Sequence, residues 1–251
     1  MPDSLDLVNR SIEQHATGPS STRGKFVTGA AATVGGAALL GTFPKLARAS
    51  STNPNNDVQT ILNVAATAEV LATIVNTVGA NRGLGGDAVT QLNIEAAARE
   101  ELIHYQVLLT YGAVPITKKI WVPDAVFASR TNLLETLVAG DQIFVNAYLI
   151  GVSCFCQVDG ALATVPAEFM GVEAVHRALA LQSLGRLGND RVFMRVDFTD
   201  ILEAVSQLQA AGFGFGSPGA KPGKFYKFDK VSQDTPNPAG LNTLEPEPIT
   251  C

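Results

Sequence analysis

"REELIHYQVLLTYGA", residues 99–113, decides the fold because it combines a helical apolar pattern with two chemically active side chains. Apolar residues in and before this stretch recur at spacings of three and four, which predicts a helix with one apolar stripe. Glu101 and His104 fall inside that stripe. Side chains three residues apart lie on one side of a helix, so we expect both to point toward the same place in an apolar interior.

The same feature recurs along the chain. Four segments have a helical apolar period, and they are residues 57–79, 87–112, 131–152 and 166–187. Each predicted helix places an acid on its apolar face, and the second and fourth add a histidine three residues later. These six side chains are Glu69, Glu101, His104, Asp141, Glu173 and His176.

The negative charge of a carboxylate at a core position has to be neutralised. Burying an unpaired carboxylate costs several kcal/mol, and neighbouring buried carboxylates repel one another and tend to protonate. Cations placed between them remove both problems. Hard oxygen ligands combined with imidazole favour iron or manganese, with zinc also able to bind. We therefore expect a site for two iron or manganese ions, with bridging carboxylates and no catalytic residue other than the ligands.

Four motifs carry a resemblance to a known family: "LNVAATAE" (62–69), "EELIHYQVLLTYGA" (100–113), "DQIFVNAY" (141–148) and "VEAVHRAL" (172–179). Over residues 56–187 the chain resembles the ferritin-like superfamily, and more narrowly the exported bacterial ferritin-like domain proteins of the desiccation-related type. The resemblance implies an all-α, up-down four-helix bundle with a long crossover between the second and third helices. It assigns the metal to the same six residues, although the family usually has glutamate where this chain has the shorter Asp141.

Residues 1–49 have the pattern of an export signal. An uncharged apolar run, 26–43, follows Arg23 and Lys25, and an A-x-A site at 47–49 comes after it. The polar segment before the run resembles a twin-arginine signal without the adjacent arginines, so a twin-arginine-like and an ordinary secretory signal are both open. An uncleaved membrane anchor is the alternative. In each case we expect the rest of the protein to be periplasmic or extracellular.

The remaining chain divides in two by composition. Residues 50–212 are expected to form the helical bundle, including a long crossover at 113–130 and a short fifth helix at 198–212 that starts near Asp197 or Thr199. Residues 213–251 are rich in glycine and proline, which predicts an irregular tail that wraps the surface or is partly disordered. Three cysteines are too few for a disulfide framework, although Cys251 could form a disulfide in an exported protein.

Some polar residues lie off the expected site. Glu100 lies about 100° around the helix from Glu101 and is expected to be solvated. Glu135 reads as a charge near a helix start. Tyr105 and Tyr148 fit either ordinary core packing or a role beside the metal, as redox-active groups or as hydrogen-bond donors to a ligand.

Composition and motifs narrow the function. A net charge of -5 without a basic patch argues against nucleic acid as a partner. The sequence offers no phosphate-binding loop and, outside the predicted export signal that contains His15, no spare histidine for a nucleophilic triad. We expect a stress-protection protein, compatible with a homo-oligomer, that oxidises Fe(II) or consumes peroxide. The alternative is a non-enzymatic protective protein in which metal only holds the bundle together. Oxidation of an organic substrate would additionally require a pocket beside the metals.

Overall fold

The computed structural model describes residues 53–244 and residue 246. The predicted export signal at 1–49 and the cysteine at position 251 lie outside the described residues, so the expectations about them stay predictions. Within the described part the protein is mostly helical and carries one small three-stranded sheet.

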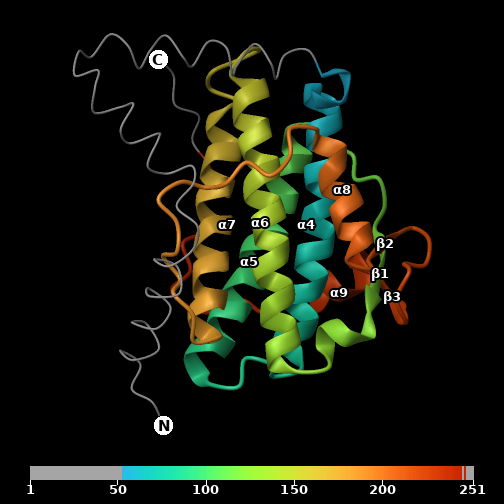
Figure 1. Cartoon of the computed structure of the whole chain (residues 1–251), viewed down its shortest axis with the longest axis vertical. Coiled ribbons are helices and arrows are strands. Elements are labelled where there is room, and N and C mark those ends of the chain that lie inside the picture. Colours follow the sequence, from blue (N-terminus) through green and yellow to red (C-terminus); the bar gives the residue numbers. More distant parts are fainter. Residues whose placement is uncertain (1–52, 245, 247–251) are drawn as a thin grey trace, which may run out of the picture.

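Four long helices lie side by side and form the body of the molecule (Figure 1). Their bounds are α4 (Val58–Asn81), α5 (Ala88–Thr110), α6 (Arg130–Phe155) and α7 (Thr164–Ser183). Three of them begin at a side chain that caps backbone N–H groups: Asp57 accepts from Thr60, Asp87 from Thr90, and Ser129 from Asn132. The predicted helices are therefore confirmed, and α7 begins two residues before the expected Pro166.

The crossover determines how the helices run. α5 and α6 run in the same direction, so the chain returns along the whole bundle between them (Figure 1). The long crossover predicted at 113–130 is therefore present, but the expectation of an all-α fold was wrong there. Residues Lys119–Pro123 form strand β1, and Asp124–Phe127 form a 3-10 turn, η2.

The C-terminal segment was expected to be irregular, and this was also wrong in part. β2 (Gly214–Phe215) and β3 (Gly223–Lys227) pair antiparallel with the two edges of β1, giving the order β2-β1-β3. Trp121 of β1 lies opposite Phe225 of β3. The short elements α9 (Phe228–Val231) and η3 (Ser232–Asp234) follow, and Phe228 is buried. Residues 214–234 therefore pair with the crossover strand and pack against α4 of the bundle.

The fifth helix, α8 (Ile201–Ala210), is shorter than predicted. Its N-cap is Asp200, whose carboxylate accepts from the backbone N–H of Leu202, and not Asp197 or Thr199. A short turn, η1 (Pro54–Asn56), precedes α4 and is tied to this region because the side chain of Asn56 accepts from the N–H of Ile201.

α4 and α6 are long and apolar enough to cross a membrane by length and composition alone. Their most apolar windows are 72% and 50% buried inside the protein. Burial against neighbouring helices accounts for that apolarity, because the central helix of a globular core has the same composition. Several buried glutamate and histidine side chains lie at the centre of this core.

Candidate metal centre

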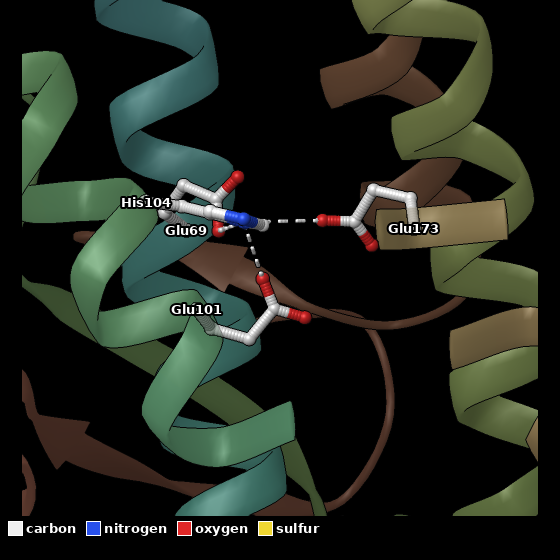
Figure 2. A group of neighbouring side chains, drawn as sticks. All are labelled: Glu69, Glu101, His104 and Glu173. Atoms are coloured by element: carbon white, nitrogen blue, oxygen red, sulfur yellow. Dashed lines mark ion pairs between the residues drawn. The ribbon is translucent and has the colours of Figure 1, made fainter. Parts of the chain in front are cut away.

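Glu69, Glu101, His104 and Glu173 meet in the middle of the helices (Figure 2). α4 supplies the first, α5 the next two and α7 the last. One ligand atom from each of them lies within 4.8 Å of the others, and all four residues are buried. The Nδ1 atom of His104 is 3.5 Å from Glu101 and 3.6 Å from Glu173. This buried group could hold a metal ion.

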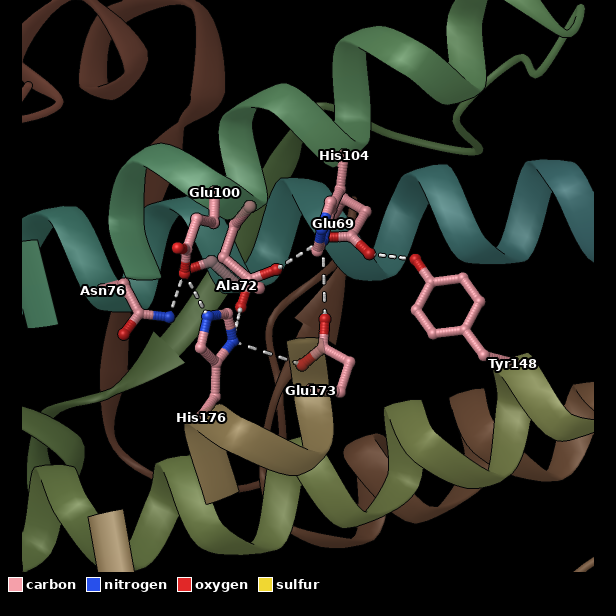
Figure 3. Close-up of polar contacts among 9 residues, drawn as sticks. Glu69, Ala72, Asn76, Glu100, His104, Tyr148, Glu173 and His176 are labelled. Carbon is pink, nitrogen blue, oxygen red and sulfur yellow. Dashed lines mark hydrogen bonds and ion pairs between the residues drawn. The ribbon is translucent and has the colours of Figure 1, made fainter. Parts of the chain in front are cut away.

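His176 of α7 extends the group on the side opposite His104 (Figure 3). Its Nδ1 atom lies 3.2 Å from Oε1 of Glu101 and 3.6 Å from Oε2 of Glu173. His104 faces the other oxygens of the same two carboxylates, Oε2 of Glu101 and Oε1 of Glu173. Each of these glutamates therefore directs one oxygen toward each histidine, which is how a carboxylate that bridges two cations would lie.

Burial and mutual repulsion dominate the electrostatics of the cluster. Burial raises the pKa of Glu69 well above its ordinary value, and the charges of Glu101 and Glu173 raise it further. Burial would also raise the pKa of Glu101, but the nearby rings of His104 and His176 outweigh it and hold that pKa well below its usual range. Glu101 therefore stays ionised more readily than Glu69.

Both histidines gain basicity from the acids. Burial would lower the pKa of His104, but the nearby carboxylates of Glu101 and Glu173 raise it to about 8. The pKa of His176 is raised well above its ordinary value because contacts with Glu100, Glu101 and Glu173 outweigh burial. Without a cation, protons on the histidines and on Glu69 have to neutralise the cluster, and a bound cation would take over that role.

Glu100 was expected to be solvated, and this was wrong. Its side chain is only 27% exposed, and its Oε2 lies 2.6 Å from Nε2 of His176 (Figure 3). This contact fixes the ring so that Nδ1 faces Glu101 and Glu173. A carboxylate behind a ligating histidine commonly sets the ring's tautomer and orientation. The pair of adjacent glutamates in "REELIH" is the sequence signal that could have revealed it.

Tyr148 lies on the other side of the cluster, where its hydroxyl hydrogen-bonds to Oε1 of Glu69 (Figure 3). Burial and the nearby Glu69 raise the pKa of the Tyr148 phenol well above its ordinary value, so it stays protonated and donates. Of the two interpretations of this tyrosine, the structure supports a donor to a candidate ligand. Phe169 stacks on His104, with ring centroids 4.1 Å apart, and closes this side with an apolar wall. Tyr105 instead packs against Phe228 of α9.

Asp141 of α6 is buried as predicted but stands slightly apart. Its Oδ2 atom has no hydrogen-bond partner within the described residues, and no ion pair joins it to either histidine there. Burial raises its pKa, and the charge of Glu173 adds to this, whereas His176 opposes it. Asp141 therefore lies on the His176 side, as Glu69 lies on the His104 side, with a shorter side chain.

The donor set fits a metal. Buried ligand atoms without a hydrogen-bond partner among the described residues converge on one place, and they include oxygens of Glu69, Glu101 and Glu173 and the Nδ1 atoms of both histidines. Buried polar atoms normally have hydrogen-bond partners. A group of this many unpartnered atoms in one place therefore calls for an ion. Oxygen and imidazole donors without thiolate suit iron, manganese or zinc.

Comparison of the chain with protein families, curated proteins and solved structures finds no match.

Proposed function

We propose that this chain is an exported ferritin-like protein that binds two iron or manganese ions and oxidises Fe(II) or consumes peroxide in stress protection. The observation that supports it is the placement of Glu101 and Glu173, each of which presents one oxygen to His104 and one to His176. Two histidines that share two carboxylates define two adjacent ion positions. Such pairs of Glu-x-x-His helices, with acids from the other two helices, characterise di-iron and di-manganese bundles.

Some residues of the cluster would hold the two ions, and others would orient the ligands. Glu69 and His104 would hold one ion, and Asp141 and His176 the other, with Glu101 and Glu173 between them. Glu100 and Tyr148 would fix the orientation of His176 and Glu69. A reducible metal pair supplies the electrons or accepts them when oxygen or peroxide reacts. The apolar surroundings, Phe169 among them, limit access of bulk water.

Metal analysis and turnover test this proposal together. The purified protein is loaded with Fe(II) or Mn(II) without oxygen, bound metal is counted, and oxygen or peroxide consumption is followed. We expect about two ions per chain and repeated turnover. Glu173→Gln keeps the size of the side chain but removes a shared carboxylate, so it should lose metal and activity. Glu168→Gln, an exposed glutamate of the same helix, is the matched control.

The results separate the alternatives. A folded protein that takes up neither iron nor manganese would overturn the proposal. Metal that binds and raises thermal stability without turnover would favour the protective protein with a structural ion. The offset position of the shorter Asp141 is the observation that supports that second candidate, because it weakens one half of the site.

A further inference from the structure

An apolar cavity of about 360 Å³ lies beside the cluster, among α4, α6 and α8. Its walls include Leu71 and Val75 of α4, Phe144 of α6 and Leu208 of α8. Exposed residues, Lys221 among them, also line it, so it reaches the surface. Its volume is within the range of small-molecule pockets, about 300–1,000 Å³.

The cavity extends to the side of the candidate metal centre. A second, much smaller space of about 30 Å³ is lined by His176. The two spaces share Asn76, Leu137 and Asp141 in their linings. These three side chains therefore separate the large cavity from the space next to His176.

Two of them are polar, and each has one buried side-chain oxygen without a hydrogen-bond partner among the described residues. Asn76 is 2% exposed and Asp141 is 4% exposed. The amide nitrogen of Asn76 donates to the carbonyl of Ala72 at 3.2 Å, which leaves Oδ1 of Asn76 and Oδ2 of Asp141 without hydrogen-bond partners among the described residues. Both of these atoms are acceptors. Leaving such buried groups unpaired is costly, so a molecule that donates a hydrogen bond to them would gain both contact and specificity.

We propose that this cavity binds a neutral, largely apolar small molecule that carries one hydrogen-bond donor, such as a phenol, an aromatic amine or a medium-chain alcohol. The donor would meet Asn76 and Asp141, and the apolar body would pack on Leu71, Phe144 and Leu208. An anionic molecule is disfavoured at the buried end of the cavity, because the unpaired oxygens of Asn76 and Asp141 offer it no hydrogen-bond donor, and the cation of the lining, Lys221, is an exposed residue. That the ligand is also a substrate for oxidation rests on the proposed function, whereas binding itself does not.

Gly140 gives direct control over the cavity. It lines the space, and a Cβ atom added there would meet no other atom within 4 Å. Gly140→Leu should therefore add an apolar side chain at the wall of the cavity, and its Cβ atom meets no neighbour. Gly171 of α7 offers the same freedom but is exposed and does not line the cavity, so Gly171→Leu is the matched control for replacing a glycine inside a helix.

The test uses two fluorescent probes that differ by one charge. N-phenyl-1-naphthylamine is neutral with one N–H donor, and 1-anilinonaphthalene-8-sulfonate is the same scaffold with an added anion. We titrate metal-free, full-length protein with each. We expect saturable binding of the neutral probe, displacement by 1-decanol, and binding of the sulfonate weaker by about tenfold or more. Gly140→Leu should weaken binding of the neutral probe by about tenfold or more, and Gly171→Leu should leave it unchanged.

Absence of saturable binding, failure of decanol to compete, or equal affinity for both probes would overturn the proposal. So would a folded Gly140→Leu variant that binds as the unaltered protein does. If circular dichroism shows that this variant does not fold, the probe pair and decanol still decide the question. Probe binding by a protein that takes up no iron or manganese would overturn the proposed function alone, and metal uptake without probe binding would overturn the cavity alone.

Discussion

Removing the carboxylate behind His176 should weaken metal binding although Glu100 is not itself expected to touch a metal. The Oε2 atom of Glu100 is 2.6 Å from Nε2 of His176, and the glutamate is only partly exposed. In Glu100→Ala the ring loses the contact that turns Nδ1 toward Glu101 and Glu173. Loss of such a supporting partner typically lowers metal affinity by about 10–100-fold, which corresponds to about 1.4–2.8 kcal/mol.

The assay is an anaerobic titration of metal-free protein with Mn(II) or Fe(II) in competition with a chelating dye. We expect the ion on the His176 side to weaken by that factor and the ion on the His104 side to change little. Glu100→Gln should recover most of the affinity, because its amide oxygen can still accept from the ring N–H. Glu168→Ala, an exposed position of α7, controls for the loss of a helix glutamate. Equal affinities for Glu100→Ala and the unaltered protein would refute the positioning role.

Three further predictions concern stability. An excess of metal at about 100 times its Kd should stabilise the fold by about 2.7 kcal/mol. In calorimetry this raises Tm by about 5–11 °C, and an unchanged Tm would argue against a metal site. A methyl group at Gly79 would lie 2.5 Å from buried Leu133, so Gly79→Ala should cost about 1–3 kcal/mol in urea unfolding, and an unchanged midpoint would contradict this close packing. Hydrogen bonds from Arg177 hold the pKa of Asp190 below its ordinary 3.8, so this pair stabilises the fold above pH 3.8 and less as pH falls through the folded-state value. The stability difference between the unaltered protein and Asp190→Asn should therefore shrink on acidification, and a pH-independent difference would count against the ion pair.

The helices and the buried acids were predictable because both depend on local periodicity. Spacings of three and four place Glu101 with His104, and Glu173 with His176, on the apolar side of α5 and α7 whatever the neighbours are. The capping residue Asp57 is likewise a local signal. The five-residue strand β1 was missed although Ile120 and Val122 are buried on either side of the more exposed Trp121. So short an alternation is also compatible with a loop, and only pairing with β2 and β3 makes it a strand.

Glu100 shows why a helical wheel misjudged a neighbour of the site. The wheel assumes one buried stripe, but α5 packs against both α4 and α7. A helix with two neighbours buries a wider arc, so a residue about 100° away from Glu101 still faces another helix.

The sequence by itself determined which side chains enter the core, because the helical period sets the face on which each residue lies. It thereby placed six side chains, all of types that can bind metals, in an apolar interior that cannot hold them unpaired. Only the tertiary structure decided how they face one another: that Glu101 and Glu173 lie between the two histidines, that Glu100 supports His176, and that a cavity opens beside Asp141. These relations join atoms of different helices, and they depend on how those helices pack rather than on any spacing along the chain.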